Sequence, residues 1–315
     1  IKLKKVNLEI LYLLMKKIYL VLFLLVLSYA TAQQESYYSL YSYQMNVINP
    51  AYAGAEASNM FSFTSRQQWA SMDNAPSTLA FSYSSARKNN VGLGISLVSD
   101  KVFVEQQTFA YVDFSYKLEM NDNTQLYLGL KCSRNFYNAD PSGLATYSIF
   151  TDPTKQQISS FNPNVGVGAF LNGEKFWVSF SIPRLFNATR DRDLAITSKD
   201  RVHSYLGGGA YLPLSSNLLF KPSLLIRKVS GLSATTDLTA MLNWKSVFEF
   251  GASFRTSSAM SVMSVIALGN FEVGYAYEVP TESSLSQLNL KTHELLLRFN
   301  LGKSTQESDS NEEEE

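Results

Sequence analysis

The chain has 315 residues, with 27 basic and 27 acidic side chains and a single cysteine, Cys132. A formal net charge of zero argues against a nucleic-acid partner, which would favour a basic excess. One cysteine excludes a secreted scaffold held together by intrachain disulfides, and we interpret Cys132 as an ordinary strand residue.

The beginning of the chain has the features of a secretory signal. Met15-Lys16-Lys17 form a basic start, Ile18 to Leu27 an apolar core, and Ala30-Thr31-Ala32 a cleavage site of the A-x-A type. The apolar core is shorter than the ~20 residues that a membrane-spanning helix needs. We therefore predict a cleaved signal peptide over residues 15–32 and a mature chain that begins near Gln33.

Residues 1–14 do not fit this pattern, so we expect them to be an upstream extension, with Met15 as the true start. The alternative is an uncleaved signal anchor over residues 8–29. Lys16 and Lys17 would then lie within the membrane helix at a cost of ~2.5–3.5 kcal/mol each, which disfavours the anchor.

The next segment, residues 33–58, does not alternate in polarity. Asn49-Pro50 disfavours helix at residue 49 and opens a turn, and Gly54 can adopt a positive φ where the chain enters the first strand. Four residues have the spacing of an apolar stripe on a short helix: Tyr38, Tyr41, Met45 and Ile48. Two interpretations stay open, a plug in the lumen of a barrel and a packed lead-in without a separate role.

Residues 59–301 consist of short segments in which two kinds of residue alternate. In Phe248 to Arg255, the three phenylalanines and Ala252 share one face, while Glu249, Gly251, Ser253 and Arg255 share the other. Successive side chains of a strand point to opposite faces of the sheet. This pattern predicts fourteen strands, at residues 59–69, 77–86, 91–99, 108–118, 124–136, 164–171, 175–182, 202–212, 218–229, 237–244, 247–255, 260–268, 271–279 and 291–301.

The connections between these strands alternate in length. Every second connection is short, at residues 87–90, 119–123, 172–174, 213–217, 245–246 and 269–270. Several of the others are longer, at residues 137–163, 183–201 and 280–290. Long loops on one rim and tight turns on the other are typical of outer-membrane barrels, whereas a soluble sandwich has no reason to alternate them. The predicted fold class is all-β, a transmembrane antiparallel β-barrel of about fourteen strands.

The charged side chains expected inside this barrel carry both signs. They are Arg66, Lys117, Lys131, Lys221, Arg227, Arg255 and Arg298 against Asp113, Asp237, Glu249, Glu272, Glu278 and Glu294. Such a lumen can pair its charges and fill itself, which favours a plugged barrel over a selective pore. We expect Arg66 to meet Asp113, Glu249 or Glu272. After the barrel, residues 302–315 form an acidic tail that we expect to be solvated and disordered.

No motif for catalysis, metal binding or cofactor binding is present. His203 and Ser204 are adjacent on a predicted strand, so their side chains point to opposite faces and cannot form an acyl-transfer pair. Gly207-Gly208-Gly209 lies within a strand without the Lys-Ser/Thr or the helix of a phosphate loop, and we interpret it as a bend or a close approach. We predict no enzymatic activity, no cofactor and no metal.

Four motifs carry a family resemblance: Asn49-Pro-Ala-Tyr-Ala-Gly54, Arg66-Gln-Gln-Trp-Ala70, Ala75 to Ser82 and Gly92 to Asp100. In their order and spacing they resemble the PorP/SprF family of outer-membrane proteins of the type IX secretion system. The resemblance covers nearly the whole mature chain, although family members often carry Gly-x-Pro in place of Asn74-Ala75-Pro76. It marks as family residues Asn49, Pro50, Ala51, Tyr52, Gly54, Arg66, Trp69, Pro76 and Asp100. We expect Trp69 at the rim on the lipid side and Pro76 at the start of the second strand.

The resemblance implies a protein of the bacterial outer membrane that helps to export or retain a cargo protein, often a large adhesin, including in gliding motility. The implied partners are the C-terminal domain of the cargo, periplasmic components of the secretion machinery and the lipid of the outer membrane. The loops at 137–163 and 183–201 would then hold the cargo. Two other functions stay open, a passive channel for small solutes and a secreted soluble β-protein that binds surface glycans.

Overall fold

The computed structural model describes residues 37–56, 58–140, 158–186, 201–256, 258–281 and 290–302. The predicted upstream extension, the signal peptide and the tail beyond residue 302 lie outside these ranges, as do residues 141–157 and 187–200 of the two predicted cargo loops. No helix within the described residues is long and apolar enough to span a membrane.

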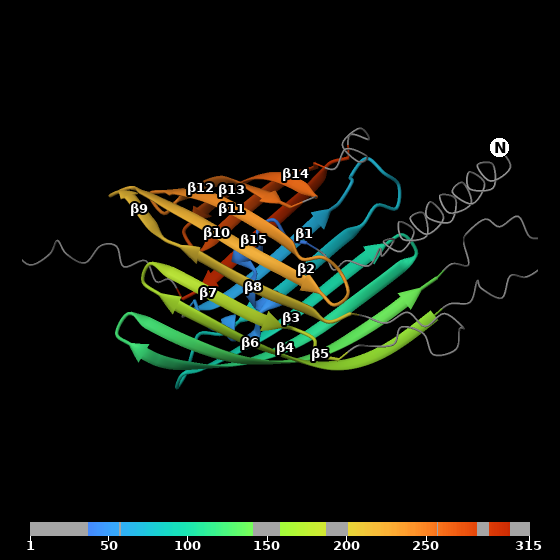
Figure 1. The fold of residues 1–315 in the computed structure, drawn as a ribbon, viewed down its shortest axis with the longest axis horizontal. Coiled ribbons are helices and arrows are strands. Elements are labelled where there is room, and N and C mark those ends of the chain that lie inside the picture. Colours follow the sequence, from blue (N-terminus) through green and yellow to red (C-terminus); the bar gives the residue numbers. More distant parts are fainter. Residues whose placement is uncertain are drawn as a thin grey trace, which may run out of the picture. The chain divides into compact units, whose positions relative to one another are not determined.

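Strands make up most of the described chain (Figure 1). They are β1 (Asn59–Gln67), β2 (Ser77–Ser84), β3 (Val91–Val102), β4 (Glu105–Asn121), β5 (Thr124–Ala139), β6 (Ile158–Gly173), β7 (Phe176–Ile182), β8 (His203–Ala210), β9 (Leu212–Ser215), β10 (Leu218–Val229), β11 (Thr235–Trp244), β12 (Phe248–Arg255), β13 (Ala259–Leu268), β14 (Phe271–Pro280) and β15 (Thr292–Leu301). Each pairs antiparallel with its neighbours, and β1 pairs with β15, which closes the sheet. Because β8 and β9 both pair with β10, they occupy one position in the wall. The closed antiparallel barrel therefore has fourteen positions, as predicted.

The prediction of one continuous strand over residues 202–212 is wrong, because the structure divides it into β8 and β9. The ladder between β8 and β10 ends at Gly209↔Ser223, and the ladder between β9 and β10 resumes at Leu212↔Phe220. Between these pairs lies Pro222, which has no N–H to donate to the opposite strand. The wall therefore lacks a regular ladder at this point.

Strands β3 to β6 are longer than predicted. The predicted loop at 137–163 shrinks to residues 140–157, because β5 continues to Ala139 and β6 begins at Ile158. Strands β3 and β4 meet in a tight turn in which Phe103 has a φ of 56°. Polar residues at the ends of these strands, next to the β3–β4 turn and the connection 140–157, interrupt the hydrophobic alternation. For this reason the pattern alone predicted strands that end too early.

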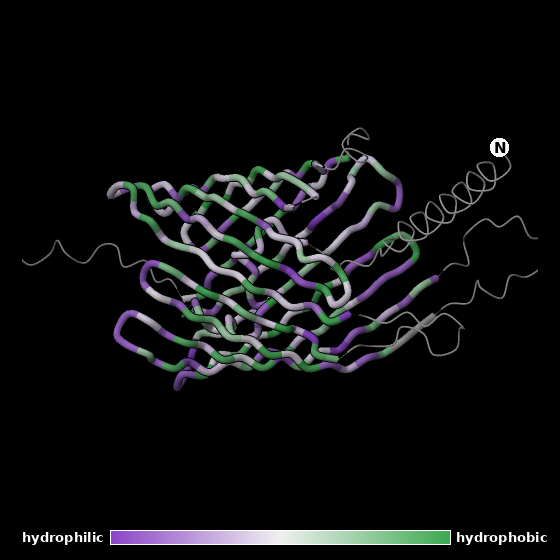
Figure 2. The backbone as a smooth tube through the Cα atoms, viewed as in Figure 1, coloured by the Kyte–Doolittle hydropathy of each residue, from purple (hydrophilic) through white to green (hydrophobic). Residues whose placement is uncertain are grey.

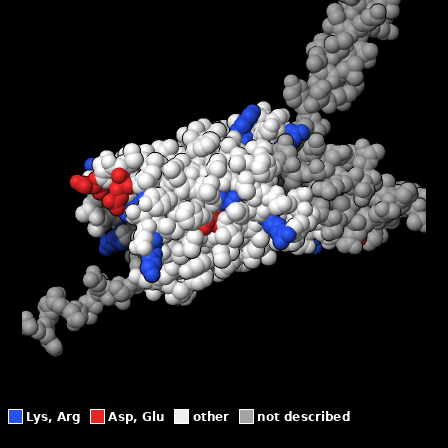
Figure 3. All heavy atoms as spheres, turned by 90° about the horizontal axis from the view of Figure 1, so that it is seen from below, with Lys and Arg blue, Asp and Glu red and all other residues white. Residues whose placement is uncertain are grey.

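The distribution of polarity is the reverse of that in a soluble protein. On β3, Leu93, Ile95 and Leu97 point outward and are 47–52% exposed, whereas Ser96 points inward and is fully buried. Figure 2 shows this alternation along the tube, with hydrophilic residues gathered at the turns. Figure 3 shows a face on which uncharged residues predominate and charged side chains are few and scattered, with the acidic ones mostly at one end. An apolar exterior on a closed sheet suits the hydrocarbon core of a membrane, so the soluble β-protein considered above is wrong.

The two rims of the barrel differ. The short-turn rim carries the connections 85–90, 122–123, 174–175, 216–217, 245–247 and 269–270. Strand β1 begins at this rim and β15 ends there. At one of these turns Asn89 and Asn90 both have positive φ, the conformation of a two-residue type I′ hairpin turn. The long-loop rim carries the other connections, including 140–157, 183–202 and 281–291. Short turns face the periplasm in barrels of the outer membrane.

Candidate functional site: a filled barrel lumen

Residues 37–56 lie inside the barrel, and we call this segment the plug. It contains two 3₁₀ helices, η2 (Tyr41–Tyr43) and η3 (Pro50–Tyr52), and one turn of α-helix, α2 (Met45–Ile48). The four predicted stripe residues are buried, but they lie on these short pieces and not on a single helix. Of the two interpretations left open for residues 33–58, the structure favours the plug for the part that it describes. Figure 1 shows this segment in blue within the barrel.

The plug crosses the lumen from the long-loop rim to the short-turn rim. At its start, the ring of Tyr37 lies 3.8 Å from the guanidinium of Arg227, near the long-loop end of β10. At its end, the N–H of Gly54 donates to Ser84 Oγ at the short-turn end of β2, 2.6 Å away. The segment therefore occupies the whole length of the lumen.

Glycines in the wall make room for the plug backbone. A Cβ on Gly129 of β5 would overlap the backbone nitrogen of Ala51, and one on Gly168 of β6 would overlap Asn49 Oδ1. Gly92 of β3 is equally close to the carbonyl oxygen of Ala53. Three strands thus lack side chains where η3 and its two flanking residues, Asn49 and Ala53, rest on them, so this fit depends on glycine in each case.

Asn49 connects η3 to the neighbouring strands β6 and β7. Its Nδ2 donates to Ser179 Oγ at 2.8 Å and to the carbonyl oxygen of Ala169 at 3.0 Å, while its Oδ1 accepts from the N–H of Ala51 at 2.9 Å. Asn49 is fully buried. Its side chain caps η3 and also binds two strands, and Pro50 occupies the first helical position, where its missing N–H costs nothing.

A buried charge network holds the start of the plug. Arg66 binds Glu278 at 2.7 Å and Glu294 at 3.0 Å, and the Glu294 carboxylate also accepts from the N–H groups of Ser39 and Leu40 at 2.8 and 3.0 Å. The network continues through Arg255, which binds both Glu278 and Asp237. All of these side chains are at most 9% exposed.

The predicted partners of Arg66 were wrong. Arg66 pairs directly with Glu294 across the β1–β15 seam, and Glu278 lies on the next strand, β14. Asp113 binds Lys131 instead, at 2.9 Å, and Glu249 binds Lys221 at the same distance. The third candidate, Glu272, binds Arg298 at 2.6 Å. The alternation showed which face each charge occupies but not which strands would be neighbours.

The predicted family residues fall into two groups that do not form one site. Asn49, Pro50, Ala51, Tyr52 and Gly54 belong to the plug or its turn into β1. The others lie toward the long-loop rim: Arg66 on β1, Trp69 and Pro76 in the connection that follows, and Asp100 on β3. Trp69 is half-buried with a φ of 51°, Pro76 directly precedes β2, and Asp100 accepts from Thr78 Oγ1 at 2.7 Å.

Several residues that hold the plug were missed at the sequence level. Glu56 binds Arg298 and accepts from the Tyr52 hydroxyl at 2.9 Å. The sequence does single out Glu56, because it is the only charged residue between Tyr37 and Asn59. The glycines at 129 and 168 gave no such signal, since glycine is common on the small face of a strand.

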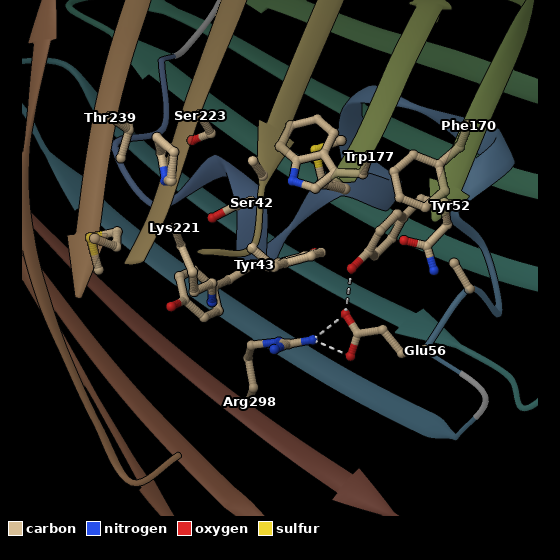
Figure 4. A pocket seen from close by; sticks show the side chains of 17 residues that line it. Ser42, Tyr43, Tyr52, Glu56, Phe170, Trp177, Lys221, Ser223, Thr239 and Arg298 are labelled. Carbon is tan, nitrogen blue, oxygen red and sulfur yellow. Dashed lines mark hydrogen bonds and ion pairs between the residues drawn. The ribbon is translucent and has the colours of Figure 1, made fainter. Parts of the chain in front are cut away.

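A cavity of about 290 Å³ lies beside the plug in the half of the barrel nearer the short-turn rim (Figure 4). Aromatic side chains form much of its lining: Tyr43, Tyr52, Phe170, Trp177 and Tyr211. The charged groups at its edge are paired, Lys221 with Glu249 and Arg298 with Glu56. The indole ring of Trp177 packs directly over Gly209, because a Cβ on Gly209 would lie 2.5 Å from the indole nitrogen. The predicted close approach at Gly207-Gly208-Gly209 is thus the packing of Trp177.

The described residues contain no group of histidine, cysteine, aspartate and glutamate arranged to hold a metal ion. His203 is buried toward the lumen, whereas Ser204 is directed away from it, and its hydroxyl donates to the carbonyl oxygen of Lys228. Cys132 is exposed on the outward face of β5. The arrangement can exclude solvent from the lumen and present surfaces at both rims.

A closed antiparallel barrel with an apolar exterior and a filled lumen defines the class of the protein: it is a β-barrel of the bacterial outer membrane. The family model of the type IX secretion system membrane protein PorP/SprF matches residues 30–299. Since this range is most of the chain, the protein belongs to the PorP/SprF family.

No curated protein matches the chain in sequence. Among solved structures, it is similar to the outer membrane protein Omp33 of Acinetobacter baumannii, at 12% identity and a TM-score of 0.45 over 78% of this chain and 99% of the other. It is also similar to the CymD monoaromatic hydrocarbon channel, at 11% identity and a TM-score of 0.48 over 82% and 91%. A FadL homologue from Pseudomonas aeruginosa has 9% identity and a TM-score of 0.45 over 80% and 92%.

Proposed function

We propose that this barrel assists the secretion or surface attachment of a cargo protein, such as an adhesin, by binding the C-terminal domain of the cargo at the long-loop rim. Membership of the PorP/SprF family supports a place in the type IX secretion machinery. Cargo recognition is the further step of the proposal, and the filled lumen is the observation that carries it.

The plug makes the barrel a poor conduit. It is bound along its length, from the Glu294 carboxylate at its start to the Arg298–Glu56 pair at its end. Buried ion pairs and wall glycines that match its backbone hold it in one position. A barrel of this kind serves a protein partner better through its rims than through its lumen.

The long-loop rim has the larger surface. Strands β5 and β6 run for 16 residues each, longer than the ~9–11 residues that cross a bilayer. Toward this rim the outward face of β5 carries Arg134 and Asn138 on either side of Phe136, whose ring packs against that of Phe161 on β6. At this length the strand ends extend past the apolar band and offer exposed polar and aromatic side chains on the outer side of the membrane.

Replacement of a loop tests where the cargo binds. Residues 183–186 are anchored to the wall, since Asn164 Nδ2 donates to the carbonyl oxygen of Phe186, so the replacement is confined to 187–200, with a short Gly-Ser linker. The matched control replaces 282–289 on the same rim. We expect the first variant to release cargo into the medium, with the barrel still showing a heat-modifiable gel shift. Cargo that stays on the cell surface in the first variant would refute docking at this loop.

A measurement of ionic conductance distinguishes the second candidate, a passive channel for small solutes, from the proposed function. Purified protein in a planar bilayer should give no large steady current, because the plug fills the lumen along its length. A large, steady open current from the unmodified chain would favour the channel over the proposal.

A further inference from the structure

The cavity beside the plug has features of a peptide site on the periplasmic side. Its lining comes from the ends of strands at the short-turn rim, namely Asn172 on β6, Trp177 on β7 and Lys221 on β10, and from the plug itself. With a volume of about 290 Å³ it is at the lower end of the ~300–1,000 Å³ found for ligand sites. It has room for one or two residues and not for a folded domain.

The charged groups of the cavity are already satisfied. The Glu249 carboxylate accepts from Lys221, from the Tyr43 hydroxyl at 2.5 Å and from Asn243 Nδ2 at 2.7 Å. Arg298 is held between Glu56 and Glu272. A charged ligand would have to break these pairs, so the cavity favours an uncharged one.

Neutral polar groups and aromatic faces remain for a ligand. Within the described part of the chain, no hydrogen bond is formed by the side chains of Ser42, Asn172 and Tyr211, all three of which line the cavity. A side-chain amide such as that of Asn172 can donate to and accept from a peptide bond at once. The rings of Trp177 and Tyr211 both line the cavity and can receive an aromatic or aliphatic side chain. Figure 4 shows Trp177 beside Phe170 at the edge of the cavity.

The cavity is also continuous with a surface that already binds polypeptide. The plug is a peptide segment held in this lumen by the same kinds of contact: a side-chain amide at Asn49, a serine hydroxyl at Ser181 that donates to the Ile48 carbonyl oxygen, and aromatic packing of Tyr52 on Phe170. We propose that the cavity binds an uncharged, extended segment of a periplasmic protein, which places an aromatic or aliphatic side chain against the rings of Trp177 and Tyr211.

The inference rests on the assignment of the short-turn rim to the periplasm and is independent of where cargo binds. The acidic tail of the same chain follows β15 at this rim, but the cavity and its edge already hold three carboxylates, Glu56, Glu249 and Glu272, against two cations, Lys221 and Arg298. This excess of negative charge repels further carboxylates, so the tail is a poorer occupant than a neutral segment.

Tryptophan fluorescence tests the proposal on the full-length protein. Because the chain has three tryptophans, the substitutions Trp69→Phe and Trp244→Phe leave Trp177 as the sole reporter. The probe is acetyl-Ala-Phe-Ala-amide, titrated into protein whose barrel is verified by its heat-modifiable gel shift. We expect a saturable change in emission in the millimolar range. Asn172→Leu and Tyr211→Leu should weaken binding at least tenfold, and Tyr116→Leu, a change on the outward face, should not.

Four outcomes would overturn the proposal. The first is the absence of a response, and the second is a response that survives both cavity substitutions. The third is a response to chitobiose and not to the peptide, which would reassign the cavity to a glycan. The fourth is a response that appears only when residues 303–315 are deleted, which would assign the cavity to the tail. Since cargo release is not measured here, failure of this test leaves the loop experiment unaffected.

Discussion

The pair formed by Asp113 and Lys131 allows a sharp test of how the lumen is stabilised. The two residues lie opposite each other on β4 and β5, their charged atoms are 2.9 Å apart, and both side chains are fully buried. At an effective dielectric constant near 20, their attraction is about 6 kcal/mol before desolvation is subtracted. Lys131→Met leaves the Asp113 carboxylate buried without its partner, which costs about 3–5 kcal/mol of unfolding free energy. It also removes the donor to the Asn46 carbonyl oxygen of the plug.

The double variant Asp113→Asn/Lys131→Met removes both charges, so we expect it to be more stable than either single variant. The assay is urea unfolding of protein in lipid vesicles, followed by gel mobility and tryptophan fluorescence, with the midpoint compared at constant m. Glu119→Gln is the matched control, because its pair with Lys117 has a similar distance of 2.8 Å but a carboxylate that is 68% exposed. We expect no measurable shift for the control. A double variant that loses the sum of the two single losses would refute the coupling.

Three further predictions concern the plug. Gly129→Val should displace the plug and open a conductance in a planar bilayer, because the new side chain would occupy the position of the plug backbone. The control Gly208→Ala has room for a methyl group and should leave the bilayer current unchanged. Asn49→Ala should leave Ser179 without its partner, at a cost of about 1–3 kcal/mol, and hydrogen exchange of residues 41–56 should become faster; exchange equal to that of the unmodified chain would contradict this. Burial raises the pKa of Tyr41 to about 12. The Tyr41 hydroxyl of the unfolded chain loses its proton near pH 10, so the free energy of unfolding should fall between about pH 10 and 12. Tyr41→Phe should remove this part of the decrease, as measured by urea unfolding at several pH values across the range.

The strands were predictable because their signal is local. An alternation with a period of two residues depends only on the pleat of the backbone, so it survives whatever strands lie on either side. The turn at Asn89-Asn90 and the long connections at 183–201 and 280–290 could be recognised for the same reason. Where the local signal is interrupted, as at Pro222 or along the polar ends of β5 and β6, the predicted bounds were wrong.

The candidate site was less predictable, because its contacts join distant parts of the chain. The faces of Arg66, Asp113 and Glu249 were predicted, but their partners depend on which strands become neighbours when the barrel closes. Family resemblance marked Asn49 and Gly54, yet it did not show that they cross the lumen. The glycines that receive the plug are recognisable only once its backbone is in place.

The sequence by itself determined the class of fold, the number of strand positions, the polarity of the two faces and the difference between the two rims. These properties follow from alternation and loop length, which are read over about ten residues at a time. Only the tertiary structure decided that the plug fills the lumen, which charges pair and where the cavity lies. Each of these depends on contacts such as that of the Ser39 N–H with Glu294, 255 positions away, and no local pattern encodes a contact at that separation.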